Sequence, residues 1–208
     1  MQVNQFYIIG NTTLPSSWVS LLLAFVLTYV IIRFRFGKRI SGVLLDSMFY
    51  FILVWKLSVV LTDFTNVIKS PLSIIYFNGG QIGFYLGLIA GLLTIKIELK
   101  KNGMHKFEKR ALFLGYVTMQ SVFQLAMVLL NEGPQTAEYV TIIMFTLILL
   151  FFWVFMIKME NDFNQFVLLY ASSHFFTVLF QPSSYMNDSF FTTIIVTVFV
   201  ISLDKLEG

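Results

Sequence analysis

Apolar residues occur along the chain in long runs that are separated by short polar segments. Seven runs predict helices over approximately 17–34, 43–62, 81–97, 111–130, 139–157, 165–181 and 189–203. Several reach the roughly 18 residues that let a helix cross a bilayer. They lack the alternating pattern of a barrel strand, so helices must satisfy the backbone in lipid. We therefore predict an all-α polytopic membrane protein with seven transmembrane helices in a single transmembrane domain, residues 1–208.

The segment 64–77 differs from these runs because it is amphipathic and contains Pro71. A proline removes a backbone donor and interrupts a helix. We interpret this segment as an interfacial or re-entrant piece and not as a further span. The first fifteen residues lack the basic and apolar regions of a secretory signal, so we expect the N-terminus to be retained.

The basic residues predict the orientation of the helices. Twelve of the fourteen Lys and Arg residues fall on one side of the seven-helix arrangement, and only Lys56 and Lys69 do not. Because cytoplasmic loops carry the excess of positive charge, the N-terminus is predicted outside and the C-terminus in the cytoplasm. The twelve residues are Arg33, Arg35, Lys38, Arg39, Lys96, Lys100, Lys101, Lys106, Lys109, Arg110, Lys158 and Lys205.

Composition agrees with a membrane protein. Charged residues make up 12% of the 208 residues and hydrophobic residues 57%, whereas a soluble domain carries roughly a quarter charged residues. The mean hydropathy is +0.80 and the sequence pI about 9.1. The loop charges that set the topology account for this basic pI, so we predict no nucleic-acid partner. The chain has no cysteine, which excludes disulfides and thiolate chemistry. The two histidines lie at different levels, and we expect no metal and no cofactor.

Lys56 is the most informative charged residue within a predicted helix. A lysine near the bilayer centre costs about 2.5–3.5 kcal/mol, so it usually faces a polar cavity or a partner. Asp46 is ten residues away, about 15 Å along a helix, and the two side chains cannot pair. The alternative is a Lys56 that snorkels to the outer interface.

The third predicted helix is rich in glycine. Gly83, Gly87 and Gly91 recur every four residues, which favours close packing against another helix. Gly79 and Gly80 precede this helix, where the backbone turns or a ligand approaches it. Tyr85, Gln124, Lys56 and His174 all fall in the outer half of the bilayer, and Gln120 lies near its middle.

Gln120 and Gln124 share one face of the fourth helix, and Tyr170 lies one turn before His174 in the sixth. A neutral histidine inside a helix bundle and amides that bridge helices are the ordinary readings of these residues. The alternative is that they line one outward-facing cavity together with Lys56 and Tyr85.

The chain resembles the bacterial prolipoprotein diacylglyceryl transferases nearly end to end. The run VWKLSVVL is similar to the family's Gly-x-Arg-Leu-Gly-Tyr-Val-Leu pattern, with Lys56 at the arginine. SPLSI at 70–74 is similar to Asn-Pro-Leu-Glu. FNGG followed by GFYLGLIAG is similar to Trp-x-Gly-Gly ending in Phe-His-Gly-Gly-Leu-Ile-Gly, with Tyr85 at the histidine.

The resemblance implies seven helices and the transfer of a diacylglyceryl group from phosphatidylglycerol to a prolipoprotein cysteine. It also implies cations on the phosphate leaving group. The family's fourth-helix arginine falls near Gln120, and its sixth-helix arginine falls at His174. Arginine is a permanent cation that grips phosphate at two points, whereas imidazole is mostly neutral at pH 7.

Two function classes follow from this resemblance. The first is a diverged, non-catalytic relative in the bacterial cytoplasmic membrane. Its outward-facing cavity would hold an anionic lipid such as phosphatidylglycerol, or it would contact a lipoprotein or another membrane protein. The second is an active transferase with Tyr85 and His174 as catalytic residues. In either class the lipid or phosphate contacts are Lys56, Gly79, Gly80, Gln120, Gln124 and Tyr170.

Overall fold

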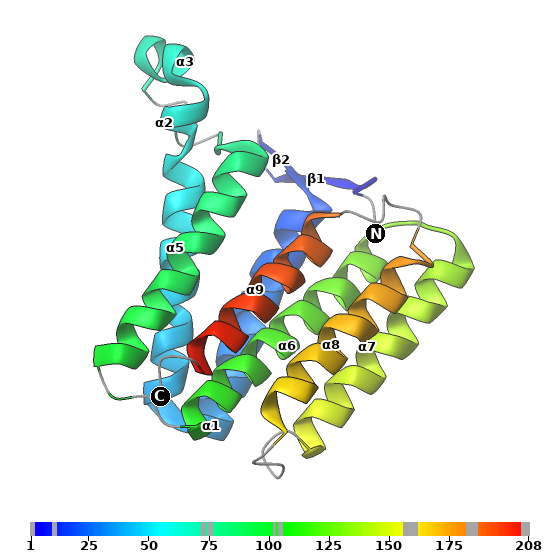
Figure 1. Ribbon diagram of the computed structural model, residues 1–208. Helices are drawn as coiled ribbons and strands as arrows, with labels where there is room; N and C mark the ends of the chain where they lie inside the picture. Colours follow the sequence, from blue (N-terminus) through cyan, green and yellow to red (C-terminus); the bar gives the residue numbers. More distant parts are fainter. Residues whose placement is uncertain are drawn as a thin grey trace. The chain divides into compact units, whose positions relative to one another are not determined.

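The computed structural model describes residues 3–9, 12–71, 74, 77–101, 103, 106–155, 162–181 and 187–204. Helices dominate this part of the chain, and the N-terminal residues form a short β-hairpin (Figure 1). The chain divides into two compact units. Unit 1 is Met1–Gly37 with His105–Gly208, and unit 2 is Lys38–Met104. Lys158, Lys205 and His105 lie outside the described residues.

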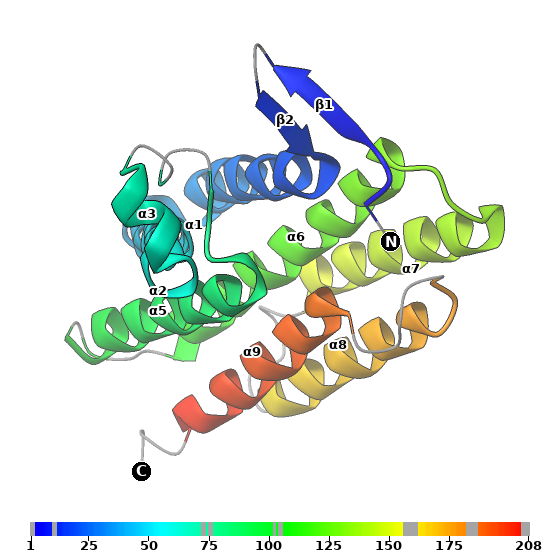
Figure 2. The ribbon, with the colours of Figure 1, turned by 90° about the horizontal axis from the view of Figure 1, so that it is seen from above.

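Unit 1 begins with the hairpin of β1 (Phe6–Ile9) and β2 (Thr12–Pro15), followed by the first part of α1 (Ser16–Leu57). It continues with α6 (Lys106–Leu130), α7 (Gln135–Phe155), α8 (Phe163–Val178) and α9 (Asp188–Asp204). α6 packs against α7, and α8 packs against α9. α6 is buried along most of its length and runs through the middle of the unit (Figure 2).

Unit 2 holds the second part of α1, then α2 (Val59–Thr62), α3 (Phe64–Lys69) and α5 (Gly80–Lys101). The glycines of α5 lie directly against α1. A Cβ added at Gly87 would lie 2.6 Å from the Phe51 carbonyl oxygen, and one at Gly91 3.0 Å from Ser47 Oγ. The prediction that this glycine repeat serves helix packing is confirmed.

The helices match the predicted apolar runs, with one difference. The runs 17–34 and 43–62 both lie within α1 and α2, but the non-helical conformation of Gly37 divides α1 into two helices, one for each run, and the helical residues extend further toward Gly37 than the runs do. The basic residues between the runs are helical because arginine and lysine are good helix formers. Gly37 has φ +80°, a left-handed conformation that favours glycine, and it marks the boundary between the two units.

Four helical stretches are long and apolar enough to cross a membrane. They are Ser16–Thr62, Gly80–Lys101, Lys106–Leu130 and Gln135–Phe155, and Asp188–Leu203 is apolar but shorter. The predicted interfacial piece begins as the short helix α3, and part of the chain after it lies outside the described residues. The all-α prediction omitted the hairpin, in which Tyr7 pairs with Leu14 and Ile8 with Thr13.

Candidate functional site

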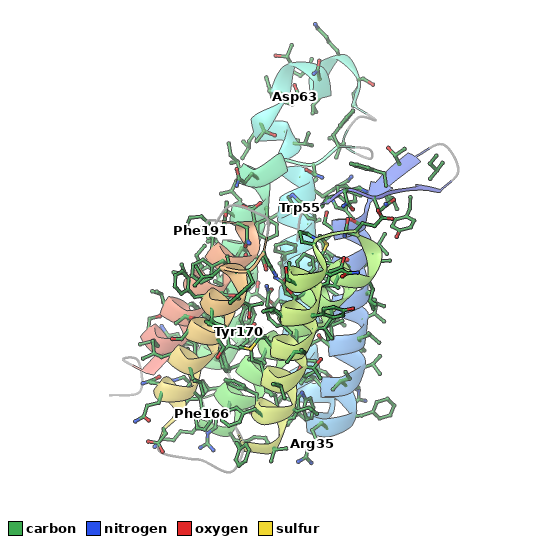
Figure 3. All side chains as sticks on the ribbon, turned by 90° about the vertical axis from the view of Figure 1, so that its right-hand side faces the viewer. Arg35, Trp55, Asp63, Phe166, Tyr170 and Phe191 are labelled. Atoms are coloured by element: carbon green, nitrogen blue, oxygen red, sulfur yellow. The ribbon has the colours of Figure 1, made fainter. Side chains whose placement is uncertain are left out.

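Polar side chains from four helices meet in the interior of unit 1. We call this set the polar cluster: Tyr116, Gln120, Gln124, Thr141, Tyr170, His174, Gln181, Ser189 and Thr193. The α6 members follow one another at intervals of four residues, as do the pairs on α8 and α9, so each helix presents one polar face. Tyr170, labelled in Figure 3, and His174 are fully buried, and Gln124 is 1% exposed.

The glutamine amides of the cluster are engaged with one another and with Ser189. Gln120 Nε2 and Gln124 Nε2 both donate to Ser189 Oγ, the second at 2.5 Å. Gln181 Nε2 lies 3.3 Å from Gln124 Oε1 and 3.2 Å from Thr141 Oγ1. These bonds tie α6, α7, α9 and the end of α8 together, since they compensate amides that would be costly to bury alone.

Thr193 is the centre of a second group of hydrogen bonds. Its hydroxyl lies 2.7 Å from His174 Nδ1 and 2.8 Å from the Tyr116 hydroxyl, and it also contacts the Ser189 carbonyl at 3.3 Å. A threonine hydroxyl carries one proton, so it donates to one of three acceptors, His174 Nδ1, the Tyr116 hydroxyl or the Ser189 carbonyl. The His174 tautomer follows from that choice.

Two further polar atoms of the cluster are buried without a hydrogen bond. They are His174 Nε2 and the Tyr170 hydroxyl, which have no hydrogen-bond partner among the residues that the structure describes. The Tyr170 hydroxyl lies close to Thr193 but does not reach hydrogen-bond geometry. The His174 ring itself contacts Phe145 at 5.2 Å and Phe190 at 5.8 Å, both edge to face.

Aromatic rings close the cluster on the side where α6 begins. The Tyr170 ring meets Phe113 at 5.9 Å and Phe152 at 5.7 Å. Beyond them, Lys109 Nζ lies 4.8 Å from the centre of the Phe163 ring. The basic residues at the start of α6 are therefore separated from the polar cluster by aromatic side chains.

The polar cluster contains no Lys, Arg, Asp or Glu side chain among the described residues. It offers hydroxyls, amides and one imidazole, which donate and accept hydrogen bonds without a fixed charge. Such a set can hold helices together or hold an uncharged polar group.

The remaining predicted site residues lie in unit 2. Gly79 N donates to the Trp55 carbonyl at 3.1 Å, and Gly80 N donates to Asn78 Oδ1 at 2.8 Å. Trp55 Nε1 donates to the Gly80 carbonyl at 3.1 Å. The two glycine N–H groups are thus already bonded within the unit. Lys56 and Tyr85 are half-buried.

The chain was compared with family models, with curated proteins and with solved structures. None of the three comparisons gave a match.

The structure thus brings four of the predicted residues together in unit 1, namely Gln120, Gln124, Tyr170 and His174. Lys56, Gly79, Gly80 and Tyr85 form part of unit 2, and a single cavity lined by both sets stays a prediction. Sequence reasoning missed the residues that complete the cluster: Tyr116, Thr141, Gln181, Ser189 and Thr193. The four-residue spacing of Tyr116 from Gln120 and of Ser189 from Thr193 is the signal that was available.

Proposed function

We propose that the chain is a seven-span protein of the bacterial cytoplasmic membrane, with its N-terminus outside and its C-terminus in the cytoplasm. It has the architecture of the prolipoprotein diacylglyceryl transferases and binds a phospholipid without transferring its diacylglyceryl group. The sequence resemblance supports the architecture, and the uncharged polar cluster supports the absence of transfer.

The length of α1 supports two crossings by this helix. The 42 residues in its two parts amount to about 63 Å of helix, twice the roughly 30 Å thickness of the hydrocarbon core. Gly37 interrupts the helix near its middle and lies among Arg33, Arg35, Lys38 and Arg39. We propose that the run 17–34 crosses the bilayer first, that the basic residues around Gly37 reach the cytoplasmic side, and that the run 43–62 crosses it again.

The proposal that the chain does not transfer the diacylglyceryl group rests on the hydrogen bonds of Gln120 and His174. The resemblance implies arginine at or near both positions. Here the Gln120 amide is bonded to Ser189, and His174 Nδ1 is bonded to Thr193. Removal of one stabilising donor typically lowers a rate by about 10²–10³, and this chain lacks more than one. Because these groups already form hydrogen bonds with one another, the cluster is better suited to holding helices together than to stabilising a leaving group.

We propose that the side chain of Lys56 binds the phosphate of the lipid headgroup. Lys56 lies in an apolar helix in which an ammonium group is costly, and an anionic headgroup beside it would lower that cost. Gly80 lies close to this part of α1, since Trp55, the neighbour of Lys56 in the sequence, donates a hydrogen bond from its Nε1 to the Gly80 carbonyl. Gly80 has φ +58°, and a Cβ added there would meet nothing within 4 Å. Tyr85 lies on the same helix as Gly80.

Native mass spectrometry after gentle extraction tests this assignment. The wild-type protein should retain phosphatidylglycerol, and Lys56→Met should retain less of it because the cation is lost while the apolar stem is kept. Lys69→Met is the matched control, since Lys69 is an exposed lysine of the same unit at the end of α3. Equal retention by the wild type and both variants would remove Lys56 from the lipid site.

Reporter fusions test the orientation independently of the lipid. Fusions in the loops between spans should report cytoplasm at Gly103 and Asn161, and the outside at Asn66, Gly133 and Asn187. Asn161 lies outside the described residues. A cytoplasmic signal at Gly133 would overturn the seven-span arrangement.

A further inference from the structure

The N-terminal hairpin has apolar side chains that the described residues of unit 1 leave exposed. Phe6 and Ile8 alternate with Tyr7 along β1 and therefore lie on the same side of the strand. Phe6 is 62% exposed and Ile8 is 78% exposed. Residues 3–15 contain no charged side chain. This composition is unusual for a segment that stands in water.

The hairpin is fixed to the α6–α7 turn by hydrogen bonds. Asn131 Oδ1 accepts from Ser16 Oγ at 2.7 Å and from Asn4 N at 3.0 Å. The Asn4 side chain bonds the Glu132 backbone in both directions, at 2.5 Å to the carbonyl and 3.2 Å from the N–H. The Tyr7 hydroxyl also reaches this turn. The direction of the hairpin is therefore set by unit 1.

The hairpin points away from the helices of unit 1, at an angle to their axes. α1 begins at Ser16 directly after β2, so the hairpin lies at the level where α1 begins. Figures 2 and 3 both show it projecting laterally past α1, on the side away from α6 to α9. Just inside this end of α1, Leu22 and Val26 are 52% and 59% exposed, as expected of a surface that faces lipid.

We propose that the hairpin lies on the bilayer surface and inserts Phe6 and Ile8 among the lipid headgroups. Aromatic and aliphatic side chains at the end of a span favour the membrane–water interface, where an apolar body enters lipid. The face is uncharged, so binding rests on apolar burial and not on anionic lipid. The proposal needs α1 to cross the membrane, but it is independent of the lipid held at Lys56.

Because the chain has no cysteine, single labels can be placed without removing any native residue. Spin-labelled Ile8→Cys should be tested in the full-length protein in vesicles of phosphatidylcholine and phosphatidylglycerol. The controls are Val26→Cys, inside the span, and Gln135→Cys, an exposed position at the start of α7. Collision with oxygen rises with depth in lipid, whereas collision with a water-soluble nickel chelate falls.

The ratio of oxygen to nickel collisions at Ile8 should lie between those at Val26 and Gln135, and Phe6→Cys should give the same result. A ratio at Ile8 equal to that at Gln135 would place the hairpin in water and overturn the proposal. Dipolar broadening at Ile8 that disappears on dilution with unlabelled protein would also overturn it, because a second copy would then cover this face. A nickel-accessible Val26 label would instead refute the crossing by α1, on which the proposal depends.

Discussion

Gly87→Ala should destabilise unit 2 because α5 and α1 touch at this position. The added Cβ would lie 2.6 Å from the Phe51 carbonyl oxygen, whereas contacts of this kind essentially never fall below 3.0 Å. The backbone must therefore move by at least about 0.4 Å, and the Trp55 Cβ, at 3.2 Å from the new atom, limits the direction of that movement. Overpacking of this type costs about 1–3 kcal/mol.

Gly42→Ala is the matched control. Gly42 is also inside α1, but a Cβ there would meet nothing within 4 Å. Alanine is a better helix former than glycine by about 0.8–1.0 kcal/mol, so this variant should be as stable as the wild type or more stable.

Thermal unfolding in detergent, followed by tryptophan fluorescence, measures both variants. Each kcal/mol corresponds to about 2–4 °C in a chain of this size. A midpoint for Gly87→Ala equal to or above that of Gly42→Ala would contradict the packing of α5 on α1.

Three further predictions concern unit 1 and the chain as a whole. Thr193→Val should lower the free energy of unfolding by about 1–3 kcal/mol because it leaves His174 Nδ1 and the Tyr116 hydroxyl without their bond, whereas Thr193→Ser should retain most of it. An unchanged free energy of unfolding in Thr193→Val would show that the hydroxyl of Thr193 does not stabilise unit 1. Asn131→Ala should increase the mobility of a spin label at Thr13, since the hairpin loses its central acceptor; unchanged mobility would show that β2 is held by other contacts. Expression of the chain should not rescue cells depleted of their own diacylglyceryl transferase, and growth restored by it would count against the proposed function.

The helical content could be predicted from hydropathy because each long apolar run corresponds to a helix. The ends of the two helices that meet at Gly37 could not be predicted in this way. Hydropathy reports which residues enter lipid, and the basic residues on both sides of Gly37 leave the apolar pattern while they are still helical. The packing of Gly83, Gly87 and Gly91 was predictable because their spacing places them on one face.

The hairpin and the polar cluster were harder to predict, for different reasons. The hairpin is short, and the only signal for it in the sequence is the Gly-Asn pair between the two runs 6–9 and 12–15, a pair of the kind that often joins two strands. The cluster depends on which helix faces meet in three dimensions. The spacing of Ser189 and Thr193 places them on one face of α9, but their partners, Gln120 and His174, come from other helices and follow only from the folded structure.

A transfer assay with the purified protein in vesicles tests the central claim most directly. The vesicles contain phosphatidylglycerol as donor, a peptide with a lipobox cysteine is the acceptor, and mass spectrometry detects the modified peptide. We predict no diacylglyceryl-modified peptide, while an authentic transferase assayed in parallel modifies it. A modified peptide that disappears with His174→Ala or Lys56→Ala would contradict the account and would show that this site performs the transfer with fewer cations.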